Sequence, residues 1–170
     1  MNVSDDCAPD ALDRLGLRVV AMSSDLAAAL VRFHESLSAE TTRSRFFTLH
    51  PHLSPSEVAR FTTVDHQQRE ALVALDDASE IVAVARFDAI ASHTAEVAFV
   101  VADAWQHCGI GSALFARLAA RAQELGVEDL VADTLAGNRA MRAVFRHAGH
   151  AVDEHLAYGV VTVTIELSPS

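Results

Sequence analysis

Lysine is absent from this sequence and cysteine is scarce, and each shortage excludes something. All 13 basic residues are arginines, so no lysine side chain of this chain is available for modification. With 23 acidic residues, the formal net charge is −10. A surface this acidic repels nucleic acid and anionic lipid, so we expect no nucleic-acid partner and no membrane partner. The two cysteines, Cys7 and Cys108, are far apart in a chain too long to depend on disulfides, and we expect reduced thiols.

Long apolar segments are absent as well. No stretch approaches the roughly 18 apolar residues of a membrane-spanning helix, and Met1 to Asp10 lacks the basic start and apolar run of a signal peptide. We therefore expect a cytoplasmic protein. The 170 residues, 51% of them apolar, suffice for one complete core. We expect a flexible N-terminal tail over residues 1–16 and a single domain over residues 17–170, present as a monomer or a homodimer.

Nine histidines raise the question of a metal site. The closest groupings are His50 with His52 and His147 with His150. Their spacing does not match a Cys/His zinc motif, and no nearby carboxylate completes a set of ligands. We therefore expect no bound metal.

Apolar periodicity predicts an α/β protein, more narrowly an α+β arrangement in which helices cover both faces of one mixed, mostly antiparallel sheet. Strands are indicated by short apolar and β-branched runs at residues 18–22, 71–75, 81–90, 96–101, 129–135, 152–158 and 160–167. Helices are indicated by apolar residues three and four apart at 26–37, 40–49, 54–61, 111–125 and 138–147. Phe46, Phe47 and Phe61 are expected to pack in the core.

The stretch from Val100 to Leu114 carries the clearest functional signal. An apolar strand runs into a polar loop that contains Gly109 and Gly111, and an amphipathic helix follows. Glycines let main-chain N–H groups approach a ligand closely, and the first N–H groups of a helix, with its dipole, favour an anion. The pattern therefore predicts a phosphate or pyrophosphate site built from the main chain.

Two segments resemble motifs of one enzyme superfamily. Residues 96–114, with the loop from Gln106 to Gly111, resemble the acetyl-CoA-binding motif of GNAT N-acetyltransferases, usually written Q/R-x-x-G-x-G/A. Residues 138–149, a helix that starts at an asparagine and ends at a glycine, resemble the motif that follows it in that superfamily. The combination is far more specific than either glycine pattern alone. It implies a GNAT-like acyl-CoA N-acyltransferase fold, acetyl-CoA as cosubstrate, and transfer of acetyl to a primary amine.

A narrower resemblance concerns the first half of the chain. Residues 33–40, 45–47 and 59–65 are similar to the acetyltransferase domain of bacterial protein lysine acetyltransferases that regulate acyl-CoA synthetases. This resemblance implies that the acceptor is a protein lysine side chain.

The superfamily resemblance also assigns residues to parts of the cofactor. It places the pyrophosphate on the loop amides and the pantetheine arm along the end of the preceding strand, where that strand is expected to splay from its neighbour. The cofactor-binding residues so implied are Phe99, Val100, Val101, His107, Cys108, Gly109, Ile110, Gly111, Ser112 and Asn138.

Glu96, at the start of the same strand, is the candidate base that takes a proton from the incoming ammonium. Many members of the superfamily carry a tyrosine seven residues after the asparagine as general acid, and this chain has Phe145 there, which has no proton to donate. Tyr158 is the only tyrosine, so either it substitutes or water protonates the leaving thiolate. Cys108 stands where relatives often have arginine or another polar residue, which removes one phosphate contact.

Two other functions remain open. The acidic surface also suits a small cationic amine as acceptor, such as an amino acid, a polyamine or an antibiotic. The missing tyrosine and the altered loop are consistent with an acyl-CoA-binding sensor that catalyses nothing. A dinucleotide-binding oxidoreductase is disfavoured, because the loop lacks a third glycine and follows a meander instead of opening a βαβ unit.

Overall fold

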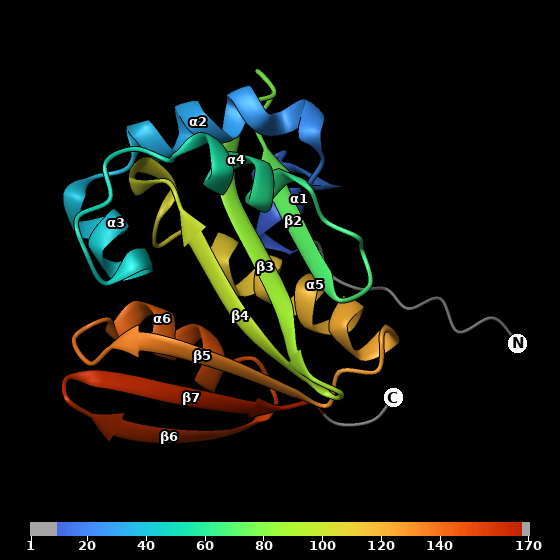
Figure 1. Cartoon of the computed structure of the whole chain (residues 1–170), viewed down its shortest axis with the longest axis vertical. Helices are drawn as coiled ribbons and strands as arrows, with labels where there is room; N and C mark the ends of the chain where they lie inside the picture. The colour runs from blue at the N-terminus through green and yellow to red at the C-terminus, as the bar shows by residue number, and fades with distance from the viewer. Residues whose placement is uncertain (1–9, 168–170) are drawn as a thin grey trace, which may run out of the picture.

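A computed structural model describes residues 10–167, which form one seven-stranded sheet with the strand order β1-β2-β3-β4-β5-β7-β6. All neighbouring strands are antiparallel except β4 and β5, which are parallel. The mixed, mostly antiparallel sheet predicted from the sequence is thereby confirmed (Figure 1). The strands are β1 (Arg18–Ala21), β2 (Arg69–Leu75), β3 (Ile81–Ala91), β4 (Thr94–Val101), β5 (Asp129–Leu135), β6 (Ala151–Ala157) and β7 (Val160–Glu166).

Helices cover both faces of this sheet and enclose two apolar clusters (Figure 1). The larger cluster lies under the face with α1 (Ala11–Arg14), α5 (Ile110–Glu124) and α6 (Arg139–Arg146). The smaller lies under the opposite face, with the short 3₁₀ turn η1 (Ser24–Leu26), α2 (Ala27–Ser36) and α4 (Pro55–Thr62). Helix α3 (Ala39–Phe46) comes between α2 and α4 in the sequence and contacts β4. A second 3₁₀ turn, η2 (Asp103–Trp105), follows β4.

The segment before β1 is more ordered than the tail expected over residues 1–16. Residues 1–9 lie outside the described residues. From Asp10 on, however, the chain packs: the Asp10 carboxylate accepts the main-chain N–H groups of Leu12 (2.8 Å) and Asp13 (3.0 Å) and pairs with Arg117 of α5 at 2.9 Å. Leu12 is completely buried. A capped turn with one buried leucine is enough to hold this segment, although its polar composition suggests a tail.

The third predicted helix begins as expected and the second ends early. Ser54 and Glu57 form a capping box at the start of α4, with Pro55 in its first turn. Helix α3, expected to continue to residue 49, ends at Phe46 because Phe47 turns into the left-handed region (φ 61°) and its N–H bonds to the Arg43 carbonyl at 2.8 Å. Phe47 is consequently 40% exposed, and its expected place in the core is wrong.

The feature that shapes the site is the divergence of β4 from β5. The two strands pair from Thr94 opposite Asp129 to Glu96 opposite Val131. Beyond Glu96, β4 stays paired with β3 as far as Val101, while β5 stays paired with β7. The sheet therefore opens into a V whose apex is at Glu96 (Figure 1).

The arm of the V beyond β5 ends in the predicted hairpin. Tyr158 and Gly159 both have positive φ (52° and 80°), as a tight turn between twisted strands requires. Glu154 of the edge strand β6 binds Arg142 and Arg146 of α6, each at 2.6 Å. These hydrogen bonds, first from Arg142 and then from Arg146, lower the pKa of Glu154 to about 2. The ion pairs fasten α6 to β6.

Candidate active site

A groove of about 1080 Å³ occupies the opening of the V. Its walls are the free end of β4, the loop into α5, helix α3, and the segment from the end of β5 into α6. All of the residues predicted to bind the cofactor line this groove, except Cys108. Three arginines line it against two acidic residues, so the groove is less acidic than the chain as a whole.

The loop into α5 presents main-chain N–H groups to this groove. Gly109 takes φ 84°, a conformation that favours glycine, and the first hydrogen bond of the helix runs from the Ala113 N–H to the Gly109 carbonyl at 3.1 Å. The N–H groups of Ile110, Gly111 and Ser112 therefore have no partner within the helix, and no side chain caps them. With no acidic residue in the first turn, the start of α5 is suited to binding an anion.

Close packing explains the second glycine of the loop. A Cβ on Gly111 would lie 3.3 Å from the ring of Phe99 and 3.7 Å from a methyl group of Val144. The absence of a side chain lets the start of α5 sit directly against β4, with α6 beside it. The anion site is thus held next to the open edge of β4.

The open edge of β4 offers hydrogen-bonding groups along the groove. The Ala102 N–H bonds to the Val82 carbonyl of the neighbouring strand at 2.8 Å. Because such bonds alternate along an antiparallel pair, the main-chain groups of Phe99 and Val101 point away from β3 and toward the groove. The Val101 carbonyl accepts the side-chain amide of Gln106 at 3.1 Å, which holds the loop against the strand. The main-chain groups of Phe99 face the groove, as an extended amide-containing ligand arm requires.

Two predicted cofactor residues use their side chains locally. The Asn138 side chain caps α6 by accepting the Met141 N–H at 3.2 Å, although the residue also lines the groove. The thiol of Cys108 lies 3.4 Å from the Gln106 carbonyl; the residue is exposed and is not among those that line the groove. The Cys108 side chain therefore does not line the groove in which the cofactor was expected to lie.

Glu96 lies at the apex of the V, where β4 leaves β5. Its side chain is exposed and makes no hydrogen bond or ion pair with another residue in the range 10–167. It shares a face of β4 with Ala98 and Val100, both of which line a second cavity, but Glu96 itself lines neither cavity. An exposed carboxylate with no hydrogen-bond or ion-pair partner among the described residues, on the strand face that carries Ala98 and Val100, is suited to take up a proton from an incoming amine.

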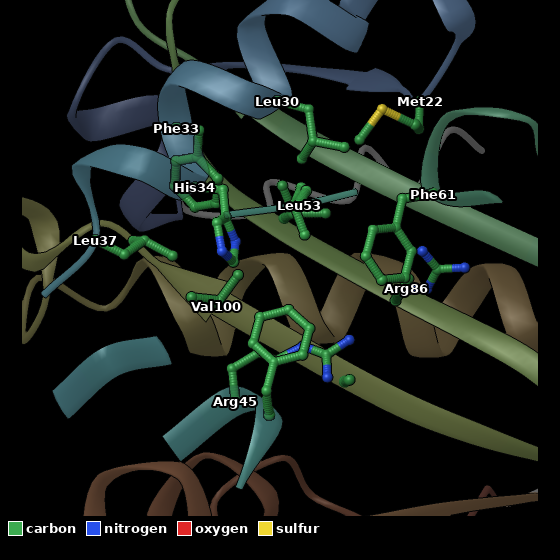
Figure 2. Close-up of a pocket in the computed structure, with 13 residues that line it drawn as sticks. Met22, Leu30, Phe33, His34, Leu37, Arg45, Leu53, Phe61, Arg86 and Val100 are labelled. Atoms are coloured by element: carbon green, nitrogen blue, oxygen red, sulfur yellow. The ribbon is translucent and has the colours of Figure 1, made fainter. Parts of the chain in front are cut away.

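The second cavity lies on the other side of β4, under α2, α3 and α4 (Figure 2). It has a volume of about 40 Å³, and Val100 and Arg45 belong to both its wall and the wall of the large groove. Most of its wall is apolar. The residues that line it are Met22, Leu30, Phe33, His34, Leu37, Arg45, Phe46, Leu53, Phe61, Val84, Arg86, Ala98 and Val100. Phe46 and Phe61 thus form a cavity wall and do not simply fill the core.

Two arginines belong to this second wall, and sequence reasoning had assigned a role to neither. Arg86 is buried, lies 4.7 Å from the centre of the Phe61 ring, and bonds to Asp88 through Nε and Nη2, each at 3.2 Å. Arg45 lies 4.9 Å from the centre of the Phe46 ring. Burial lowers the pKa of Arg45 to about 10, the charge of Arg86 acts in the same direction, and the charge of Glu96 acts in the opposite one. No motif marks these residues, because they meet only through packing.

Neither the position at which the family carries its general acid nor the single tyrosine of this chain presents an acid to the groove. Phe145, at the position where many GNAT enzymes carry tyrosine, is completely buried with ring centres 5.2 Å from Phe115 and 5.6 Å from Phe99. Tyr158, the only tyrosine of the chain, is fully exposed at the tip of the hairpin and lines neither cavity. Neither of these two positions therefore presents a proton donor to the groove.

Neither a metal site nor a membrane helix emerges from the described part of the chain. Between residues 10 and 167, no three or more His, Cys, Asp or Glu side chains come together in a way that would hold a metal ion. Within the same range, no helix is both long and apolar enough to cross a membrane.

The chain is similar to several known proteins. Residues 30–150 match the model of the Acetyltransferase (GNAT) family. The GNAT domain of S. lividans PAT is 37% identical, with a TM-score of 0.83 over 89% of this chain and 90% of that one. A mutant of the cAMP-binding acyltransferase from Mycobacterium smegmatis is 25% identical, with a TM-score of 0.60 over 90% of this chain and 44% of that one. The acetyltransferase yncA from Salmonella typhimurium, solved with its cofactor acetyl-CoA, is 17% identical and has the same fold, with a TM-score of 0.73 over 91% of this chain and 95% of that one.

Proposed function

This chain belongs to the GNAT family of acetyltransferases and is an acetyl-CoA-dependent N-acetyltransferase, and on that premise we propose that its acceptor is the side-chain amine of a protein lysine. The observation that carries this proposal is the 37% identity to the GNAT domain of S. lividans PAT over nearly the whole of both chains. The resemblance of residues 33–40, 45–47 and 59–65 to protein lysine acetyltransferases supports it.

The groove fits acetyl-CoA in three respects. The N–H groups at the start of α5 suit the pyrophosphate, and the open edge of β4 at Phe99 suits the amides of the pantetheine arm. The volume of about 1080 Å³ is large enough for a ligand of that size. When bound, acetyl-CoA supplies an acetyl group activated as a thioester. We assign Gly109 to Ser112, Phe99 to Val101, His107 and Asn138 to holding it, through main-chain groups wherever the side chain is small or turned away.

The acceptor amine enters from the side of Glu96. Its ammonium form is not nucleophilic, and the Glu96 carboxylate, exposed and without a partner among residues 10–167, accepts its proton directly or through a water molecule. Because Phe145 is buried and Tyr158 lies at the hairpin tip, water supplies the proton that the released thiolate takes up.

The test compares two classes of acceptor with the purified enzyme and labelled acetyl-CoA: a purified acyl-CoA synthetase, and a panel of amino acids, polyamines and aminoglycosides. Mass spectrometry of the products locates the label. Labelling of specific lysines of the synthetase supports the proposal, and label found only in small amines refutes it in favour of the small-amine alternative. The enzyme contains no lysine, so its own side chains add no lysine signal to the assay.

A further inference from the structure

We propose that Arg45 forms an anion subsite in the acceptor site, which binds a carboxylate that the acceptor carries near its reacting amine. The inference rests on the proposed function for the reaction, but it concerns the chemistry of the acceptor and is tested by binding as well as by turnover. Arg45 has no hydrogen-bond or ion-pair partner among residues 10–167, it lines both cavities, and the charged side chains around it are mostly arginines.

The two arginines of the second cavity differ in their partners. Arg86 is satisfied by Asp88, which also accepts the Arg69 Nε at 2.6 Å. Arg45 forms no hydrogen bond or ion pair with any residue from 10 to 167, and its guanidinium lies over the face of the Phe46 ring. The charges of Glu96 and Asp88 act on Arg45, but neither carboxylate forms a hydrogen bond or ion pair with it, so its donors are not used by the described residues. Arg45 is therefore the group of this wall with unused capacity to bind an anion.

The position of Arg45 relates this capacity to the reaction. Arg45 and Val100 line both the cofactor groove and the second cavity. Glu96 lies on the same face of β4 as Val100, and its charge acts on Arg45. Figure 2 shows Arg45 and Val100 on the same wall of the second cavity, so a group bound at Arg45 lies against the strand face that also carries Glu96.

The local charge favours a carboxylate over a second cation. The net charge of −10 suggests a cationic acceptor, yet the charges at this site are mostly positive. Arg45 and Arg86 line the cavity, the charge of Arg60 acts on both, and Arg69 shares Asp88 with Arg86. Against these four arginines stand two carboxylates whose charges act on Arg45, Asp88 and Glu96. With a pKa of about 10, Arg45 is still charged at neutral pH. This surplus attracts a carboxylate and favours the neutral, reactive form of the amine.

Two kinds of acceptor present this chemistry. One is a protein lysine with an aspartate or glutamate next to it, and the other is a free amino acid with its α-carboxylate. Both place a carboxylate within the length of one side chain of the amine, and a guanidinium binds either through paired hydrogen bonds. The experiment separates them by using one matched pair of acceptors for each.

The first pair is two peptides that differ only in a glutamate or glutamine beside the acceptor lysine, and the second is lysine and lysinamide. Binding of each compound to the enzyme loaded with CoA is measured by calorimetry, so that no transfer occurs, and kcat and KM are measured with acetyl-CoA. The variants are Arg45→Gln, which removes the charge, and Arg45→Lys, which retains it. The control is Arg32→Gln, an exposed arginine of α2 that pairs with Glu80 outside both cavities.

We expect the wild-type enzyme to bind the carboxylate member of one pair about tenfold or more tightly than its amide partner, with the difference in KM and not in kcat. Arg45→Gln should abolish the preference, Arg45→Lys should retain part of it, and Arg32→Gln should retain all of it. The pair that shows the preference identifies the source of the carboxylate. Equal binding within both pairs, or a preference that survives Arg45→Gln, overturns the inference. If a carboxylate preference is seen in binding but no compound is acetylated, the proposed function fails and the subsite stands.

Discussion

The substitution Glu96→Gln removes the charge of the proposed base while keeping the size of its side chain. At pH 7 a lysine amine with an ordinary pKa of about 10.4 is neutral in only about one molecule in 2500, which corresponds to about 4.6 kcal/mol. That figure is the most a base can contribute by deprotonating the amine. Because the arginines around the second cavity already favour the neutral amine, we expect kcat/KM to fall by less, about 10²- to 10³-fold.

The structure also says what this substitution leaves unchanged. Glu96 does not line the groove, so the affinity for acetyl-CoA measured by calorimetry should stay the same. Its side chain is exposed and makes no hydrogen bond or ion pair between residues 10 and 167, so the free energy of unfolding should change by less than about 0.5 kcal/mol. The control is Glu128→Gln, an exposed glutamate whose ion-pair partner is His93.

The pH dependence is the decisive measurement. As the pH rises toward the pKa of the free amine, the neutral form becomes abundant in solution and a base is no longer needed, so the deficit of Glu96→Gln should shrink steadily. Thiol release is followed with a lysine acceptor from about pH 6 to about pH 10. A deficit that is the same at every pH, or no deficit at all, would refute the assignment of Glu96 as the base.

Three further predictions concern the loop and the fold. Gly109→Ala should lower the free energy of unfolding, measured by denaturant titration, by about 1–2 kcal/mol. The reason is that φ at Gly109 is 84° and the new Cβ would lie 3.1 Å from the Cβ of Ala11. A change below about 0.5 kcal/mol would contradict the docking of α1 on the loop. Cys108→Ser should leave the calorimetric affinity for acetyl-CoA within about twofold, because the thiol is turned to the Gln106 carbonyl, and a tenfold loss would show that the thiol contacts the cofactor. Glu154 has a pKa lowered to about 2, so its contribution to stability is complete above its unfolded pKa and is lost as the pH falls from about 4.5 toward about 2. Glu154→Gln should therefore reduce the dependence of the free energy of unfolding on pH over this range. The same dependence in wild type and variant would show that the ion pairs of Glu154 contribute nothing.

The parts of the fold that could be predicted from the sequence are those fixed by interactions between residues close together in the chain. The helix predicted from residue 54 and the break predicted between the strands 152–158 and 160–167 each depend on residues within a few positions of one another, and the structure has a capping box at Ser54 and a turn at Gly159 there. One deviation arose where a distant contact outweighed local composition, and the other where a single residue turned into the left-handed region. Polar residues around Leu12 suggested a tail, but packing against α5 orders the part of it that is described, and α3 stopped at Phe46 although its apolar residues continue.

The site was predictable to different degrees on its two sides. The cofactor side follows from the chain itself, because the strand, the glycine loop and the helix that build it are contiguous between Phe99 and Ser112. The proposed acceptor side draws on residues from distant segments, such as Met22, Arg45 and Val84, which line the second cavity. No spacing rule relates residues that far apart, so Arg45, although part of the resembling segment 45–47, had no assigned role before its neighbours were known.

The sequence by itself determined the order of strand, glycine loop and helix and the motifs of the GNAT family, and from these it predicted a main-chain anion site, because glycine conformation, helix capping and strand alternation act over a few residues. Only the tertiary structure decided where β4 parts from β5, that Phe145 is buried while Cys108 faces away from the groove, and that an arginine without a counter-ion among the described residues stands between two cavities. The physical reason is that burial and unpaired charge belong to the packing of distant segments, and no single stretch of sequence contains them.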